Sequence, residues 1–177
     1  MKWALFLIFT AMICSLLWMW QMDNHTTATA YLRLKQSLDR ATHDAALQIK
    51  HSLLADEARL EFSDDAETVL WSSLEQNLRM QLNDGAPAHV TSTSLFRIED
   101  PLQLLLFERL EKGCSSALDG FPCTYVNGTY GYVDTIRGPS IVAIIAMRHP
   151  RPFALSQERF FIVGSSHEYV AWSTRER

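Results

Sequence analysis

The run "WALFLIFTAMICSLLWMWQM", from Trp3 to Met22, carries no charged side chain. An apolar helix of about 20 residues is the length that crosses about 30 Å of bilayer hydrocarbon. Trp3 lies at one end of the run and Trp18 and Trp20 lie at the other, where interfacial aromatic residues are enriched. The sequence therefore predicts a transmembrane anchor over residues 1–25 that contacts the lipid bilayer.

The charges that flank the run predict its orientation. Lys2 precedes it and Asp23 follows it, which favours a cytoplasmic N-terminus and a C-terminal domain outside the cytoplasm. A cleaved signal peptide is the alternative, because Ala28–Ala30 offers a small-x-small cleavage pattern. The apolar core is longer than the usual signal-peptide core, which favours an uncleaved single-pass anchor. Both interpretations place the rest of the chain outside the cytoplasm.

The cysteines fit that compartment. Cys114 and Cys123 are nine positions apart, with Gly113, Gly120 and Pro122 bending the chain around them. In an oxidising compartment this pair is expected to form a disulfide, and two separate thiols are the alternative.

The stretch "YLRLKQSLDRATHDAALQIK", Tyr31 to Lys50, predicts an amphipathic helix, either capped at Thr26 or Thr27 or continuous with the anchor. Its apolar stripe changes from leucine to alanine and forms a helix-packing seam of Leu34, Leu38, Ala41, Ala45 and Ile49. Small residues let two helix axes approach closely. The partner is either the protein's own domain, which is the commoner arrangement, or another subunit.

A second helix is predicted from a capping-box pattern, Asp64 with Glu67, followed by leucines at every fourth position up to Leu82. The turn residues Asn83–Gly85 are expected to end it. The predicted organisation is residues 26–86 as a helical stalk with this second helix. Residues 87–177 follow as a β-rich part that packs with the helices as one domain.

Residues beyond Pro87 predict strands, namely "TSTSLFRI", "LQLLLFERL", "SIVAIIAM", "RFFIVG" and "HEYVAW", the last one at a sheet edge. Asn127-Gly128 is typical of a two-residue type I′ hairpin, which would place Tyr125 opposite Tyr130 and Cys123 opposite Tyr132. The predicted fold is therefore α+β, with a mostly antiparallel sheet behind two helices.

No motif for catalysis, a cofactor or a metal is found. His43 and His51 lie eight apart on a helix, an arrangement typical of a solvated face. The net charge of −4 provides no basic surface for nucleic acid. We therefore predict a non-enzymatic protein without catalytic residues, cofactor or metal site.

The phrase "LDRATHDAALQ" after an N-terminal apolar segment resembles the TadE/TadG-like group of minor pilin-type envelope proteins. The residues that carry the likeness are Leu38, Asp39, Arg40, Ala41, Ala45, Ala46, Leu47 and Gln48. The resemblance covers about the first 50 residues and does not extend to a processed pilin leader, since residues 1–22 contain neither Gly nor Glu. It implies a pilin-like structural or assembly component that contacts other envelope or pilus-apparatus proteins through its N-terminal helix. The alternative is a membrane-anchored binding or sensing module with a pocket among Tyr125, Tyr130 and Tyr132.

Overall fold

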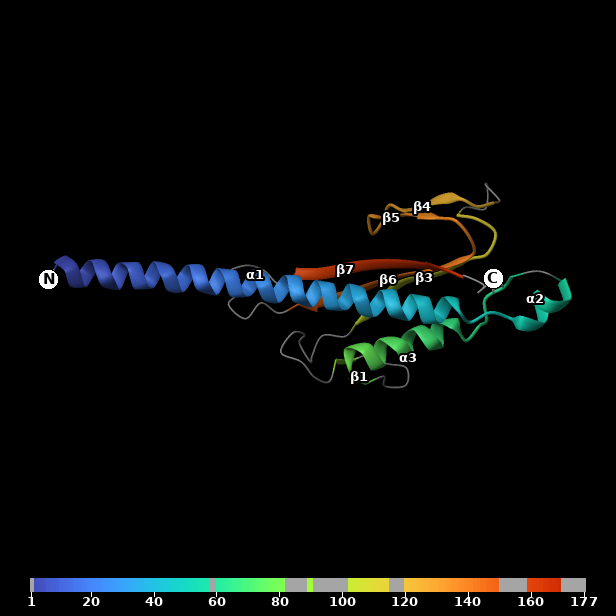
Figure 1. Cartoon of the computed structure of the whole chain (residues 1–177), viewed down its shortest axis with the longest axis horizontal. Helices are drawn as coiled ribbons and strands as arrows, with labels where there is room; N and C mark the ends of the chain where they lie inside the picture. Colours follow the sequence, from blue (N-terminus) through green and yellow to red (C-terminus); the bar gives the residue numbers. More distant parts are fainter. Residues whose placement is uncertain are drawn as a thin grey trace, which may run out of the picture.

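The computed structural model has the α+β fold that the sequence predicts (Figure 1). It describes residues 2–57, 60–81, 89–90, 102–114, 120–149 and 159–169. The helices are α1 (Lys2–Ala46), α2 (His51–Glu57) and α3 (Ala66–Leu78). The strands are β1 (Met80–Gln81), β2 (His89–Val90), β3 (Gln103–Leu110), β4 (Cys123–Asn127), β5 (Tyr132–Ile136), β6 (Ser140–His149) and β7 (Arg159–Glu168).

Helix α1 is one continuous rod of 45 residues, about 68 Å long at about 1.5 Å per residue. Its apolar N-terminal half projects beyond the rest of the molecule and is not buried (Figure 1). The hydroxyls of Thr26 and Thr27 donate to the carbonyls of Met22 and Asp23, four residues back, so neither threonine caps a helix. The anchor and the amphipathic helix are therefore one element.

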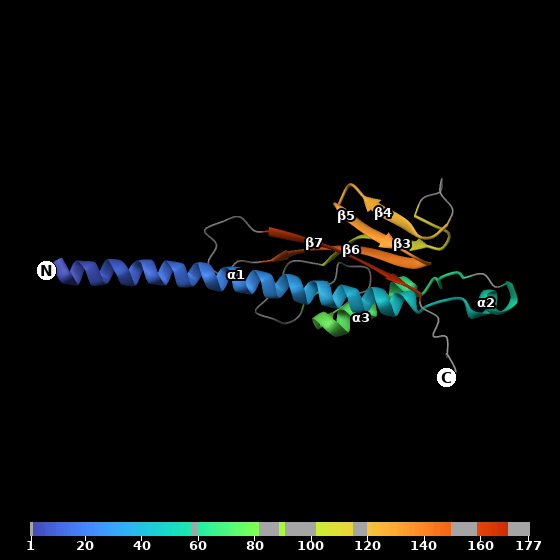
Figure 2. The same ribbon diagram turned by 45° about the horizontal axis from the view of Figure 1, so that its top comes forward.

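Three strands form the central sheet in the order β3-β6-β7, and both pairs are antiparallel. Helix α1 packs on one face of this sheet, and α3 packs against α1. The β4–β5 hairpin lies over the other face of the sheet (Figures 1 and 2). The central strand β6 is buried over Ser140–Met147, which confirms the strand that its apolar run predicts. The "LQLLLFERL" stretch is also a strand, β3.

Two of the predicted strands merge. "RFFIVG" and the start of "HEYVAW" belong to the single strand β7, which ends at Glu168 and lies at an edge of the central sheet. The predicted strand "TSTSLFRI", residues 91–98, lies outside the described residues.

Helix α3 is shorter than its leucine pattern suggests. It ends at Leu78, and Arg79 follows with a left-handed backbone (φ 53°), so the prediction that the helix runs to Asn83–Gly85 was wrong. Its N-cap is Asp65, not Asp64. The Asp64 carboxylate instead accepts a hydrogen bond of 2.8 Å from Arg109 on β3.

The hairpin register also differs from the prediction. Asn127 pairs with Tyr132 and Tyr125 pairs with Asp134, so residues 128–131 form the loop. The Asn127 side-chain oxygen accepts a hydrogen bond from the backbone N–H of Tyr130 (3.1 Å), and the positive φ (66°) falls at Gly131. The partner of Tyr125 thus shifts by four residues, from Tyr130 to Asp134, and an even shift keeps side chains on the same face. Tyr125 and Tyr132 therefore still face the sheet, whereas Tyr130 lies in the loop.

Candidate functional site at the junction of α1 and β7

The helix-packing seam is buried within the protein's own core. Leu34, Leu38, Ala41 and Ala45 are completely buried, and Ile49 is 7% exposed. Ile49 lies beyond the end of α1 and forms an isolated β-bridge with Phe62, so it is not a helical residue. The seam therefore packs against the chain's own α3 and sheet, and another subunit is not needed to cover it.

The three anchor tryptophans are the most exposed aromatic residues near the N-terminus. Trp3 is 81% exposed, Trp18 63% and Trp20 65%. A soluble environment would disfavour so much exposed aromatic surface, whereas a bilayer would accommodate it. Their placement is consistent with a membrane anchor or a signal segment.

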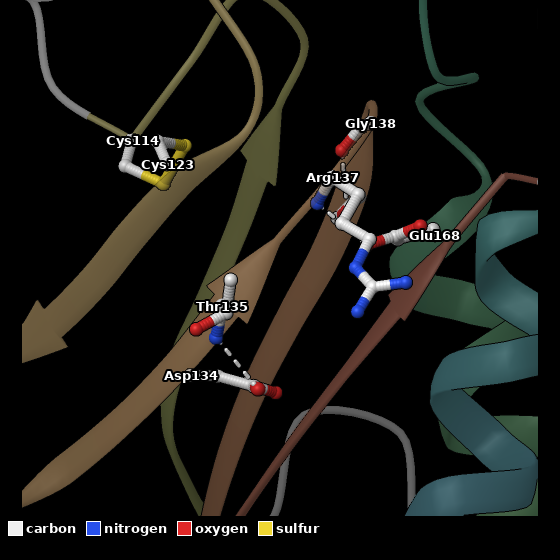
Figure 3. Close-up of a disulfide and its surroundings, with 8 residues drawn as sticks. Cys114, Cys123, Asp134, Thr135, Arg137, Gly138 and Glu168 are labelled. Carbon is white, nitrogen blue, oxygen red and sulfur yellow. Dashed lines mark hydrogen bonds between the residues drawn. A yellow bond between two sulfur atoms is a disulfide. The ribbon is translucent and has the colours of Figure 1, made fainter.

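Cys114 and Cys123 form the predicted disulfide, which ties the segment after β3 to the start of β4 (Figure 3). Where the chain passes from β5 to β6, the backbone N–H of Arg137 donates to the Glu168 carboxylate of β7 (2.6 Å; Figure 3). The hairpin is thus held by a covalent bond and by a charge-assisted hydrogen bond to β7. A disulfide of this kind suggests a domain outside the cytoplasm.

Polar side chains join α1 to β7. Lys35 donates to Asp39 (2.7 Å) and to the carbonyl of Gly164 (2.8 Å). Ser165, which is 1% exposed, donates to the same Asp39 oxygen (2.7 Å) and contacts the Thr42 hydroxyl (2.8 Å). Because each buried hydroxyl has a partner, this row fixes the register of α1 on the edge strand. No substrate could reach Ser165, so the row is structural.

A second polar group lies on the hairpin face of β7. Tyr132 donates to Asp134 (2.9 Å), Ser166 donates to the same carboxylate oxygen, and the N–H of Thr135 donates to the other (2.8 Å; Figure 3). Burial opposes ionisation of Asp134, but these hydrogen bonds outweigh it and hold the Asp134 pKa below its ordinary value. The Tyr132 ring lies directly over Gly164.

Tyr125 has an equivalent anchor on β3, where its hydroxyl donates to Glu108 (2.6 Å). The rings of Tyr125 and Tyr132 lie 6.3 Å apart. Burial first, and then the adjacent carboxylate of Glu108, raises the pKa of Tyr125 to about 12. Burial likewise raises the pKa of Tyr132 to about 12, with Asp134 adding to the effect. Both side chains are therefore engaged in holding the hairpin on the sheet.

A depression of about 410 Å³ lies where α1, α3 and β7 meet. Its lining residues are Asp39, Arg40, His43, Asp44, Asn77 and His167. The rings of His43 and His167 lie edge-to-face, with centroids 5.3 Å apart. Burial, and then the charge of His43, lowers the pKa of His167.

Sequence reasoning missed this pairing, because it grouped His43 with His51 on a solvated helix face. His51 instead begins α2, and the neighbour of His43 comes from a strand 124 positions later in the chain. Within the described part of the chain, no three His, Cys, Asp or Glu side chains converge as a metal site. The junction therefore offers two imidazoles on an open surface.

Comparison with known proteins gives no match to a family model, to a curated protein or to a solved structure.

Proposed function

We propose that the chain is a non-enzymatic, single-pass membrane protein that serves as a pilin-like structural or assembly component of a bacterial pilus or secretion apparatus. Its N-terminus is cytoplasmic and its domain lies outside the cytoplasm. The observation that carries the proposal is the continuity of α1, whose first half is apolar and unburied and whose second half forms part of the domain core. The resemblance to TadE/TadG-like proteins supports the same role.

An apparatus component must hold its domain at a fixed height and rotation above the bilayer, so that neighbouring subunits meet in register. A helix without a break transmits that orientation, and Leu34, Leu38 and Ala41 lock it to the domain. A tethered binding module gains nothing from such rigidity, because a flexible linker would serve it equally well.

The test separates rigid from tethered attachment. A helical insertion of about two turns (~7 residues) at Thr27 preserves both the rod and the phase of the helix. A Gly/Ser insertion of the same length breaks the rod. With a photo-crosslinking residue at the exposed position Leu32, we expect discrete adducts to envelope-apparatus proteins for the wild type and the helical insertion only. Equal adducts for the flexible insertion would contradict the structural role.

The topology needs its own measurement. Thr129 lies in the exposed hairpin loop, so a Thr129→Cys variant should react with an impermeant thiol reagent in intact cells. Labelling only after lysis would reverse the proposed orientation. The intact mass of the purified protein distinguishes an uncleaved anchor from a signal segment removed near Ala30.

A membrane-anchored binding or sensing module is the second candidate, and the depression beside His43 and His167 favours it. The tyrosines do not, because Tyr125 and Tyr132 are held between the hairpin and the sheet. This second function predicts that the flexible insertion is tolerated and that a ligand binds at the junction.

A further inference from the structure

His43 and His167 form an edge-to-face ring pair beside an open depression. His43 comes from the exposed face of α1 and His167 from β7, and neither imidazole makes a hydrogen bond to any other residue that the structure describes. Both rings line the same open depression. Four ring nitrogens, two of them acceptors in the neutral form, are therefore available on a solvent-accessible surface.

The separation of the rings fits a shared ion. With metal–nitrogen bonds of about 2.0 to 2.1 Å, two imidazoles on one tetrahedral ion have ring centroids about 5.2 Å apart. The observed separation is 5.3 Å, and the interplanar angle of 72° is compatible with two adjacent coordination positions.

The neighbouring carboxylates can complete the surroundings of such an ion. Asp39 accepts hydrogen bonds from Lys35 and Ser165 through its Oδ1 atom. Asp44 accepts a hydrogen bond from Ser73 through its Oδ2 atom. The other oxygen of each carboxylate can hydrogen-bond to metal-bound water.

The balance of charge selects the type of metal. Lys35 and Arg40 offset Asp39 and Asp44, so the junction has no excess of negative charge to attract a hard cation. Affinity must then come from the imidazole nitrogens, which prefer Cu²⁺, Ni²⁺ and Zn²⁺ to Ca²⁺ and Mg²⁺.

We propose that His43 and His167 form a two-histidine binding site for a divalent transition-metal ion of the nitrogen-preferring class, with water in the remaining coordination positions. An ion held by only two protein ligands is expected to exchange with ions in solution, whereas a structural ion has a full set of protein ligands. The site joins α1, the rod that continues from the membrane anchor, to β7 of the sheet. Bound metal would strengthen that connection. This inference is independent of the proposed apparatus role, since the site would exist in either function.

The test is a Cu²⁺ titration of the full chain in detergent, purified without a polyhistidine tag and followed by pulsed electron paramagnetic resonance. We expect one ion with two imidazole ligands. His43→Gln and His167→Gln should each weaken binding by at least about tenfold and remove one imidazole from the signal. His51→Gln, an exposed histidine at the start of α2, is the matched control and should bind as the wild type does.

An excess of Ca²⁺ or Mg²⁺ should not displace the ion. Circular dichroism checks that each variant is folded, and His43→Gln carries the test alone if His167→Gln unfolds, because His43 is exposed. The proposal is overturned by a wild type that does not bind, by affinity that survives both substitutions, or by a signal from a single imidazole. In each of these cases the pair is only an edge-to-face ring contact.

Discussion

Gly164 is the position where a single methyl group should do most harm to the packing of the hairpin on β7. A Cβ atom there would lie 2.7 Å from Tyr132 Cε2 and 2.8 Å from Cγ, and nearer still to Cδ2. These are ring atoms rather than the end of a flexible chain, so the ring itself must move. Its hydroxyl is held by Asp134 at 2.9 Å, so that movement also strains a hydrogen bond. Gly164→Ala is therefore an overpacking substitution.

Overpacking of this kind costs about 1 to 3 kcal/mol. The reduced flexibility of the unfolded chain returns about 0.4 to 1 kcal/mol for Gly→Ala. A net loss of about 1 to 2 kcal/mol lowers the melting temperature by about 2 to 8 °C for a chain of this size. Thermal unfolding of the full chain in detergent, followed by circular dichroism, measures the loss. Gly128→Ala is the matched control, because no atom lies within 4 Å of a Cβ built there.

A double-mutant cycle makes the attribution specific. Tyr132→Ala removes the ring, so Gly164→Ala should cost nothing further in that background, and the coupling energy should equal most of the single-mutant loss. The reasoning is refuted if Gly164→Ala melts with the wild type, or if its cost is the same with and without the Tyr132 ring.

Three further outcomes are expected. Peptide mapping without reductant should recover Cys114 linked to Cys123, and recovery of two free thiols would contradict the disulfide. Replacing both cysteines with alanine should lower the free energy of unfolding by about 2 to 3 kcal/mol, as expected for so short a loop. Ala45→Leu should lower stability by about 1 to 3 kcal/mol, because Ala45 is completely buried; an unchanged melting temperature would show that the seam is not packed. Two of the five tyrosines should ionise late in an absorbance titration, since folding raises the pKa of Tyr125 and Tyr132 to about 12 from about 10. Their contribution to stability is complete below about pH 10 and is lost as the pH rises toward 12; a single transition near pH 10 in folded protein would contradict the buried hydrogen bonds.

The sequence predicts the elements of this fold well where burial dictates a pattern. The pattern of apolar side chains follows directly from the environment of the segment in three cases: the apolar run of the anchor, the stripe on α1 and the continuous apolar run of β6. The same holds for the Cys114–Cys123 bridge, because a separation of nine residues limits the geometry locally. These features depend on contacts within one segment or with solvent.

Predictions failed where a side chain bonds to a distant partner or to its own backbone. Asp64 accepts its hydrogen bond from Arg109 on β3, and the Asn127 carboxamide organises a longer loop than its Asn-Gly dipeptide indicates. The pairing of His43 with His167 has no local signal at all, because it follows from the register of β7 on α1. Ser165 sets that register through Asp39, and only the folded chain brings those two residues together.

The change from leucine to alanine along α1 now has a physical account. Helix α3 runs antiparallel to α1, since Arg40 donates to Asn77 (3.3 Å) while Ser73 donates to Asp44 (2.7 Å). Towards the N-terminus of α1, Tyr31 contacts Phe161 of β7, and the leucines of the stripe fill the space beside the sheet. Beyond residue 40, α1 is enclosed by the sheet on one side and α3 on the other, so a large side chain would hold both apart. The alanines at 41, 45 and 46 are buried in this enclosed part of α1, and small residues permit close approach of neighbouring elements there. The seam therefore joins the projecting N-terminal half of α1 to the domain.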